Sequence, residues 1–141
     1  MTAAPDQSNV VALPGADDQI VLLPPGEYLG VYSRHRALRI FRTAKVAVLF
    51  RLAEHPGIVL ARWYRVQDVR GGRIRAGAHS DLVRELSAVL GRRVRADRVP
   101  VASFGDCVVR VEVRTVTTDH EQRELAEPNR YSIIARVVGR A

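Results

Sequence analysis

The chain has 141 residues, a formal net charge of +7 and a hydrophobic content of 47%. This length predicts one compact domain, and the apolar content excludes a disordered chain. The longest apolar runs, such as residues 46–50, are too short to cross a bilayer, and no signal-peptide pattern is present. We therefore expect a cytoplasmic protein with no membrane partner. The single cysteine, Cys107, excludes an internal disulfide and a cysteine-based metal cluster.

The positive charge is concentrated in one part of the sequence. Residues 31–75 hold eleven cations against two carboxylates, whereas residues 1–30 hold four acids and no cation. Nearly all the cations are arginines, whose planar guanidinium groups bind phosphates and stack on bases. This concentration indicates a surface that binds a polyanion, with a generally basic soluble surface as the alternative.

Residues 1–22 lack a sustained hydrophobic period and predict a flexible tail, followed by a folded domain over residues 23–141. Alternating polarity from residue 27 predicts a first strand that is interrupted at residues 34–36. In this pattern Leu29 and Val31 face the core, whereas Tyr28 and Tyr32 face away from it. Alternation resumes with Leu38 before the next strand.

Two further strands are predicted at residues 43–54 and 58–66, separated by a His-Pro-Gly turn. In the second strand Val46, Val48 and Phe50 share the core phase. In the third strand Tyr64 shares the core phase and Trp63 has the opposite one. A loop is expected at residues 68–78, which contain three glycines.

The remainder of the chain predicts one helix and two strands. The helix follows Ser80 or Asp81 as its cap, buries a stripe of leucines and valines, and ends at Gly91. Strands are expected at residues 107–115 and 131–138, with a polar loop at residues 117–129 between them. The fold class is therefore mainly β: a five-stranded antiparallel barrel of the OB type, with one helix between the third and fourth strands.

Short motifs in this layout resemble a family of OB-fold single-stranded-DNA-binding proteins of phages and mobile elements. The motifs are Pro-Gly-Glu-Tyr at residues 25–28, Val-Ala-Val-Leu-Phe at 46–50, Gly-Ile-Val-Leu at 57–60, and Asn-Arg-Tyr-Ser-Ile-Ile at 129–134. The resemblance covers residues 24–138. It implies sequence-tolerant binding of single-stranded DNA in replication, recombination or transfer of a mobile element. An acidic C-terminal stretch, common in that family, is missing, so recruitment of replication proteins through such a tail is not expected.

An OB barrel binds its ligand on strands two and three and on the adjoining loops. Cations there would neutralise phosphates, and exposed rings would stack on unpaired bases. Trp63 is the best stacking candidate, whereas packing is the favoured role of the tyrosines. The candidate binding residues are Arg34, Arg36, Arg39, Arg42, Lys45, Arg51, Arg62, Trp63, Arg65, Arg73, Arg75, Tyr28 and Tyr32.

The sequence gives no indication of an enzyme, a metal site or a cofactor. Its four histidines lack ligand spacing, and the Asp-His-Glu triplet at residues 119–121 falls in a polar loop. Two alternatives to DNA remain: RNA as the ligand, or a protein-interaction module whose arginines contact an acidic partner. A homodimer or higher homo-oligomer formed through exposed edge strands is compatible with each of these readings.

Overall fold

The computed structural model describes residues 22–119, 121–126 and 130–141. The tail predicted at residues 1–22 lies almost entirely outside the described residues. The elements are, in chain order, β1 (Gly26–Ile40), β2 (Thr43–Leu52), β3 (Val59–Val66), β4 (Asp68–Arg70), β5 (Arg73–Arg75), α1 (Asp81–Leu90), the 3-10 helix η2 (Val101–Asp106), β6 (Val109–Val116) and β7 (Tyr131–Arg140).

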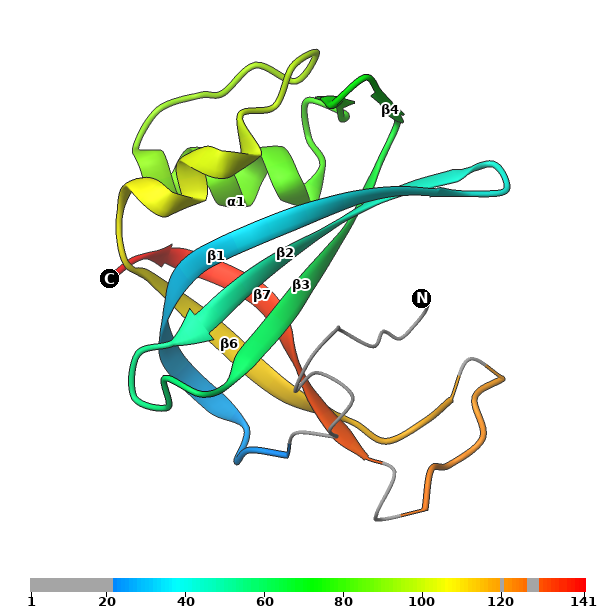
Figure 1. The fold of residues 1–141 in the computed structure, drawn as a ribbon, viewed down its shortest axis with the longest axis vertical. Helices are drawn as coiled ribbons and strands as arrows, with labels where there is room; N and C mark the ends of the chain where they lie inside the picture. The colour runs from blue at the N-terminus through cyan, green and yellow to red at the C-terminus, as the bar shows by residue number, and fades with distance from the viewer. Residues whose placement is uncertain (1–21, 120, 127–129) are drawn as a thin grey trace. The chain divides into compact units, whose positions relative to one another are not determined.

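Five strands form the main sheet, in the order β3-β2-β1-β6-β7 (Figure 1). The pairs β1–β2, β1–β6 and β2–β3 are antiparallel. The fold is therefore mainly β with an antiparallel sheet and one α-helix, as the sequence predicts. In the described residues β3 and β7 are the two edges of this sheet, so a closed barrel is not seen.

Strand β1 is a single 15-residue strand, and the charged triplet at residues 34–36 does not interrupt it. Its first residues pair with β6, and residues 30–40 pair with β2. A register shift between Tyr32 and Arg34 marks a β-bulge, which adds one residue and reverses the alternation beyond it. The predicted interruption is therefore wrong, because a bulge accommodates the mismatch while the hydrogen-bonded ladder continues.

The core lies against the face of β2 that carries Val46, Val48 and Phe50, all fully buried, while Ala47 and Leu49 on its opposite face are also buried. From the other side it is filled by the stripe of α1, including Leu82, Leu86 and Val89. Phe104 of η2, an element that the sequence did not predict, completes it. Its ring lies edge-on to Phe50 at 5.6 Å and parallel to Tyr64 at 6.3 Å between centroids.

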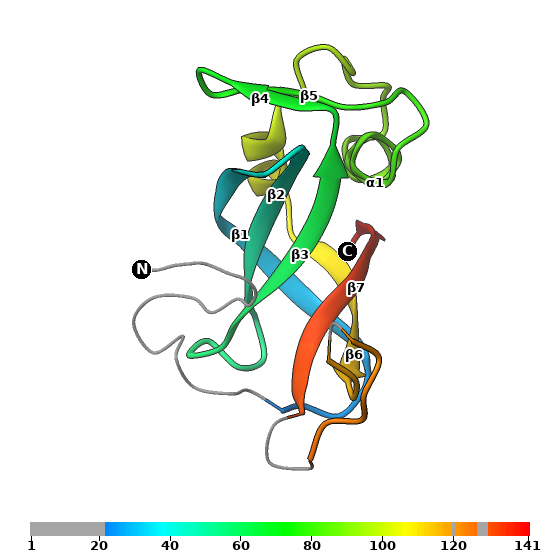
Figure 2. The same ribbon diagram turned by 90° about the vertical axis from the view of Figure 1, so that its right-hand side faces the viewer.

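Helix α1 begins and ends where the sequence predicts. The Ser80 side chain accepts a hydrogen bond from the Val83 backbone N–H, which satisfies one of the free amide donors of the first turn. At the other end Gly91 has φ 71°, a left-handed conformation that glycine adopts without steric cost. Figure 2 shows α1 beside the small hairpin of β4 and β5.

The β4–β5 hairpin occupies part of the predicted loop at residues 68–78. Gly71 and Gly72, both with positive φ, form its turn, and Ile74 is buried beneath it. The glycines that favoured a loop therefore serve a two-residue hairpin turn.

The chain divides into two compact units. One unit comprises residues 24–114 and 133–141 and contains every candidate binding residue. The other comprises residues 1–23 and 115–132. In its described part, the Asp119 carboxylate accepts hydrogen bonds from the backbone N–H groups of Glu121 and Arg123, and Arg130 pairs with Glu124. Within the described ranges, no helix combines the length and apolarity that a membrane span requires.

Candidate nucleic-acid interface

The strand register brings several predicted binding residues onto one face of β1, β2 and β3. Directly paired residues of antiparallel strands point to the same side of a sheet. We call the side opposite to Val46, Val48 and Phe50 the outer face. Its cross-strand rows are Val31–Arg51–Val59, Arg34–Leu49–Ala61, Arg36–Ala47–Trp63 and Leu38–Lys45–Arg65, with the pair Ile40–Thr43 next to the turn.

The part of the outer face between Val31 and Thr43 is positive. Five cations lie on it, namely Arg34, Arg36, Lys45, Arg51 and Arg65, and the cross-strand rows given above contain no carboxylate. Nearer the start of β1, Glu27 lies on the same side of the strand and forms an ion pair with Arg110 of β6. Among the described residues, the side chains of Arg36, Lys45, Arg51 and Arg65 make no ion pair and no hydrogen bond. A row of cations without acidic neighbours repels itself, and a bound polyanion would relieve that repulsion.

Several cations elsewhere in the same unit are paired with carboxylates. Arg84 pairs with Asp81 on the helix, Arg95 with Asp97 in the loop before η2, and Arg136 with Glu112 on the strands β7 and β6. In each pair a carboxylate already offsets the positive charge. Other exposed arginines, such as Arg92, Arg93 and Arg98, also make no ion pair in the described part of the chain, so the outer face differs from them in grouping its cations around Trp63.

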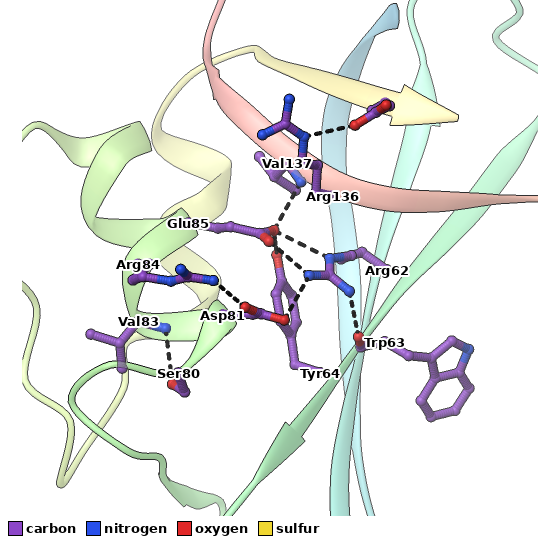
Figure 3. A network of polar contacts seen from close by, with 11 residues as sticks. Arg62, Trp63, Tyr64, Ser80, Asp81, Val83, Arg84, Glu85, Arg136 and Val137 are labelled. Atoms are coloured by element: carbon purple, nitrogen blue, oxygen red, sulfur yellow. Dashed lines mark hydrogen bonds and ion pairs between the residues drawn. The ribbon is translucent and has the colours of Figure 1, made fainter. Parts of the chain in front are cut away.

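Trp63 lies at the centre of the outer face, next to the small side chain of Ala47. The side chain of Trp63 is half-buried. Its neighbours on the strand, Arg62 and Tyr64, face the other side of the sheet. Figure 3 shows the indole pointing away from the polar network formed on that other side. A flat ring among cations is the arrangement on which unpaired bases stack.

Arg62 belongs to that polar network and not to the outer face. Its guanidinium donates two hydrogen bonds to the carboxylate of Glu85 on α1, at 3.2 and 2.7 Å, and lies 4.3 Å above the Tyr64 ring. Only 13% of the Arg62 side chain is exposed. We therefore leave Arg62 out of the interface.

Glu85 also receives two other donors. The Tyr64 hydroxyl donates at 2.6 Å and the Val137 backbone N–H at 2.8 Å (Figure 3). Burial, together with the negative charge and hydrogen bond of Glu85, raises the pKa of Tyr64 well above its usual value, so the hydroxyl remains protonated. One helix carboxylate thus joins β3 to β7, the two edge strands. Sequence reasoning missed this role, because Glu85 follows a helical pattern typical of a solvated face.

Four other candidate cations lie at or beyond the end of the three strands. Arg39 faces the core side of β1 and pairs with Asp68, and Arg42 lies in the β1–β2 turn. Arg73 and Arg75 line a pocket of about 310 Å³ together with Asp68, Arg70 and Asp97. Because two carboxylates share this pocket, its charge is mixed, and it extends the outer face less effectively than the sequence suggests.

Tyr28 and Tyr32 point to the core side of β1, contrary to the predicted phase. Tyr28 pairs with Val111 and Tyr32 with Phe50, and both of those partners are fully buried. The apolar residues that suggested the opposite phase, Leu29 and Val31, are only partly buried. The prediction failed because β1 contributes glycine and tyrosine to the core and places aliphatic residues outside it.

The two tyrosines are held at the margin of the core. The Tyr28 hydroxyl donates to the Pro24 carbonyl at 2.7 Å, and the Tyr32 hydroxyl lies 2.7 Å from Nδ1 of His35. Burial raises the pKa of Tyr32 and lowers that of His35. Their hydroxyls are engaged within the protein, so we assign neither ring to the interface.

Over the described ranges, no three His, Cys, Asp or Glu side chains gather closely enough to hold a metal ion. Comparisons with protein-family models, curated proteins and solved structures found no match to this chain. The ligand of the outer face is therefore inferred from the residues of the chain itself.

Proposed function

We propose that the protein binds single-stranded DNA on the outer face of β1, β2 and β3, without strong sequence preference. The observation that carries the proposal is the set of five cations around Trp63, whose cross-strand rows in the described strands contain no carboxylate. Cations attract the phosphates whatever the sequence, and an indole stacks on any base. The family resemblance in the sequence motifs points to the same function.

The proposal includes an OB-type barrel. The strand order supports it, because the first strand pairs with both its successor and the fourth major strand. The contact of Glu85 with Arg62 and Val137 supports it too, since α1 then bridges the two edge strands that a barrel brings together. In such a barrel the second and third strands form the ligand surface.

Single strands are favoured over duplex DNA by the shape of the basic surface. The cations lie on a sheet around an indole, whereas the apolar stripe of α1 is committed to the core. No helix is therefore presented to a major groove in the described part of the chain. A single strand exposes bases for stacking, which a duplex keeps inside.

The direct test is a fluorescence titration, because Trp63 is the only tryptophan of the chain. Emission is expected to be quenched on addition of oligo-dT, and a duplex of the same length should bind more weakly. Absence of quenching together with absence of a gel shift at low salt would contradict the proposal.

A pair of charge-matched variants tests the location. The first combines Lys45→Ala, Arg51→Ala and Arg65→Ala, and the second combines Arg92→Ala, Arg93→Ala and Arg98→Ala at exposed sites between α1 and η2. Both change the net charge from +7 to +4 (7 − 3). The first variant should bind oligo-dT about 10- to 100-fold more weakly, because each exposed contact contributes up to about 1 kcal/mol.

The second variant should change the affinity by less than about twofold at moderate salt, where distant charges are screened. Equal losses in both variants would mean that only the net charge matters and would remove the assignment to this face. Capture of an acidic protein that survives nuclease treatment and depends on the same three residues would favour the protein-interaction alternative.

A further inference from the structure

The turn between β1 and β2 presents a bare aromatic ring. Phe41 is 95% exposed and has φ 55°, whereas Arg42, the other residue of the two-residue turn, does not have a positive φ. In hairpin turns of this kind the first position is normally glycine, because a bulky side chain is strained there. The chain thus keeps a phenylalanine where both the backbone and the solvent disfavour it.

This ring continues the outer face. Ile40, which is 41% exposed, lies on the same side of β1 as Arg36 and Leu38. From the Ala47 row to the Thr43 row the distance is four residues of β2, or about 13 Å at roughly 3.3 Å per residue. Figure 1 shows the β1–β2 hairpin extending past the end of β3, so its tip is open to a ligand.

The charges along this path are also suitable for a nucleic acid. Lys45 and Arg65 form one cross-strand row between Trp63 and the tip, and Arg42 follows Phe41 directly in the turn. Cations therefore alternate with flat or apolar side chains from the middle of the sheet to the end of the hairpin. A linear path of this kind fits an extended strand better than the planar surface of a membrane.

We propose that Phe41 is a second base-stacking site, and that one single strand crosses the outer face from Trp63 to the hairpin tip. This inference rests on the proposed function, to which it adds the path of the bound DNA strand across the protein. It requires that an oligonucleotide long enough to reach the tip gains affinity from Phe41. A short one held at Trp63 gains nothing from it.

The test compares the wild type with Phe41→Asn by Trp63 quenching. Oligo-dT of about 4 and about 16 nucleotides spans the range of site sizes of OB-type folds. For the long oligonucleotide the variant should bind about 5- to 150-fold more weakly, the range for loss of one stacked base. For the short one its affinity should equal that of the wild type.

The same variant separates binding from folding. Asparagine tolerates a positive φ better than phenylalanine, so Phe41→Asn should have an unchanged or higher melting temperature while it loses affinity. Phe41→Tyr, which keeps a flat ring, should restore binding of the long oligonucleotide, and Phe41→Leu, which is apolar but not flat, should not.

A direct readout places the fluorophore at the tip. Phe41→Trp in a Trp63→Phe background should be quenched by the long oligonucleotide. Full affinity of Phe41→Asn for that oligonucleotide, or no quenching at the tip, would overturn the inference while wild-type quenching still upheld the proposed function. Flotation with anionic vesicles that Phe41→Asn abolishes would assign the tip to a lipid surface and would equally overturn it. A wild type that binds neither oligonucleotide would refute the proposed function itself.

Discussion

Glu85 accepts hydrogen bonds from Arg62, Tyr64 and the Val137 backbone, and only 12% of its side chain is exposed. Such a carboxylate is stable in a site with little water because its oxygens are fully engaged. It also fixes the side chain of Arg62 on the core side of β3. One residue on α1 therefore decides that Arg62 is structural while its neighbour Trp63 stays available.

Removal of this carboxylate is expected to be costly. Glu85→Ala should lower the free energy of unfolding by about 3–5 kcal/mol, because it leaves the buried Arg62 without its main partner. Denaturant unfolding measures the change. The control is Glu112→Ala, which removes an exposed partner of Arg136 and should cost about 0–1 kcal/mol. Equal costs would show that Glu85 is not the bridge that the contacts indicate.

His35 makes stability depend on pH. Burial lowers its pKa in the folded protein, so the unfolded chain binds a proton more readily. The contribution of His35 is then complete above the unfolded pKa near 6.5, and it is lost as the pH falls through that value towards the lower folded one. The free energy of unfolding should therefore fall in this window. His35→Asn should flatten the curve there, and an identical fall in the variant would exclude His35 as its source.

At the scale of the element, α1 shows what local sequence can predict. Its apolar stripe, a cap at Ser80 or Asp81 and its terminal Gly91 are predicted correctly, because each depends on residues within a turn of one another, and the structure places the cap at Ser80. Strand β1 shows the opposite. Its phase depends on a bulge near Ser33 and on which residues of β2 and β6 lie opposite, and no local pattern contains that information.

The helix end offers a test at this scale. Gly91→Ala should lower the free energy of unfolding by about 1–2 kcal/mol, because alanine is strained at φ 71°. Gly91→Asn should cost less, since asparagine tolerates the left-handed region. Gly57→Ala is the control, because Gly57 has no positive φ and a Cβ there meets nothing within 4 Å. If both alanine variants cost the same, the left-handed cap is not what makes Gly91 necessary.

At the scale of the whole molecule, the net charge of +7 predicts binding that weakens with salt. If all five cations of the outer face contact phosphates, the logarithm of affinity should fall with the logarithm of salt concentration with a slope of about −3.5. In the variant lacking Lys45, Arg51 and Arg65 the slope should be less steep by about 2. Titrations at several salt concentrations measure both values, and a slope that the three substitutions leave unchanged would place the phosphate contacts elsewhere.

The sequence by itself determined the mainly β composition, the helix with both of its ends, the excess of positive charge in residues 31–75 and the phase of Trp63. These properties depend on composition and on short-range periodicity. Only the tertiary structure decided which cations share a face with Trp63. Arg39 and Arg62 are as basic as Lys45 and Arg65, but partners distant in the sequence, Asp68 and Glu85, engage them. Charge pairing is a property of spatial neighbours, and these neighbours are set by strand register and helix docking.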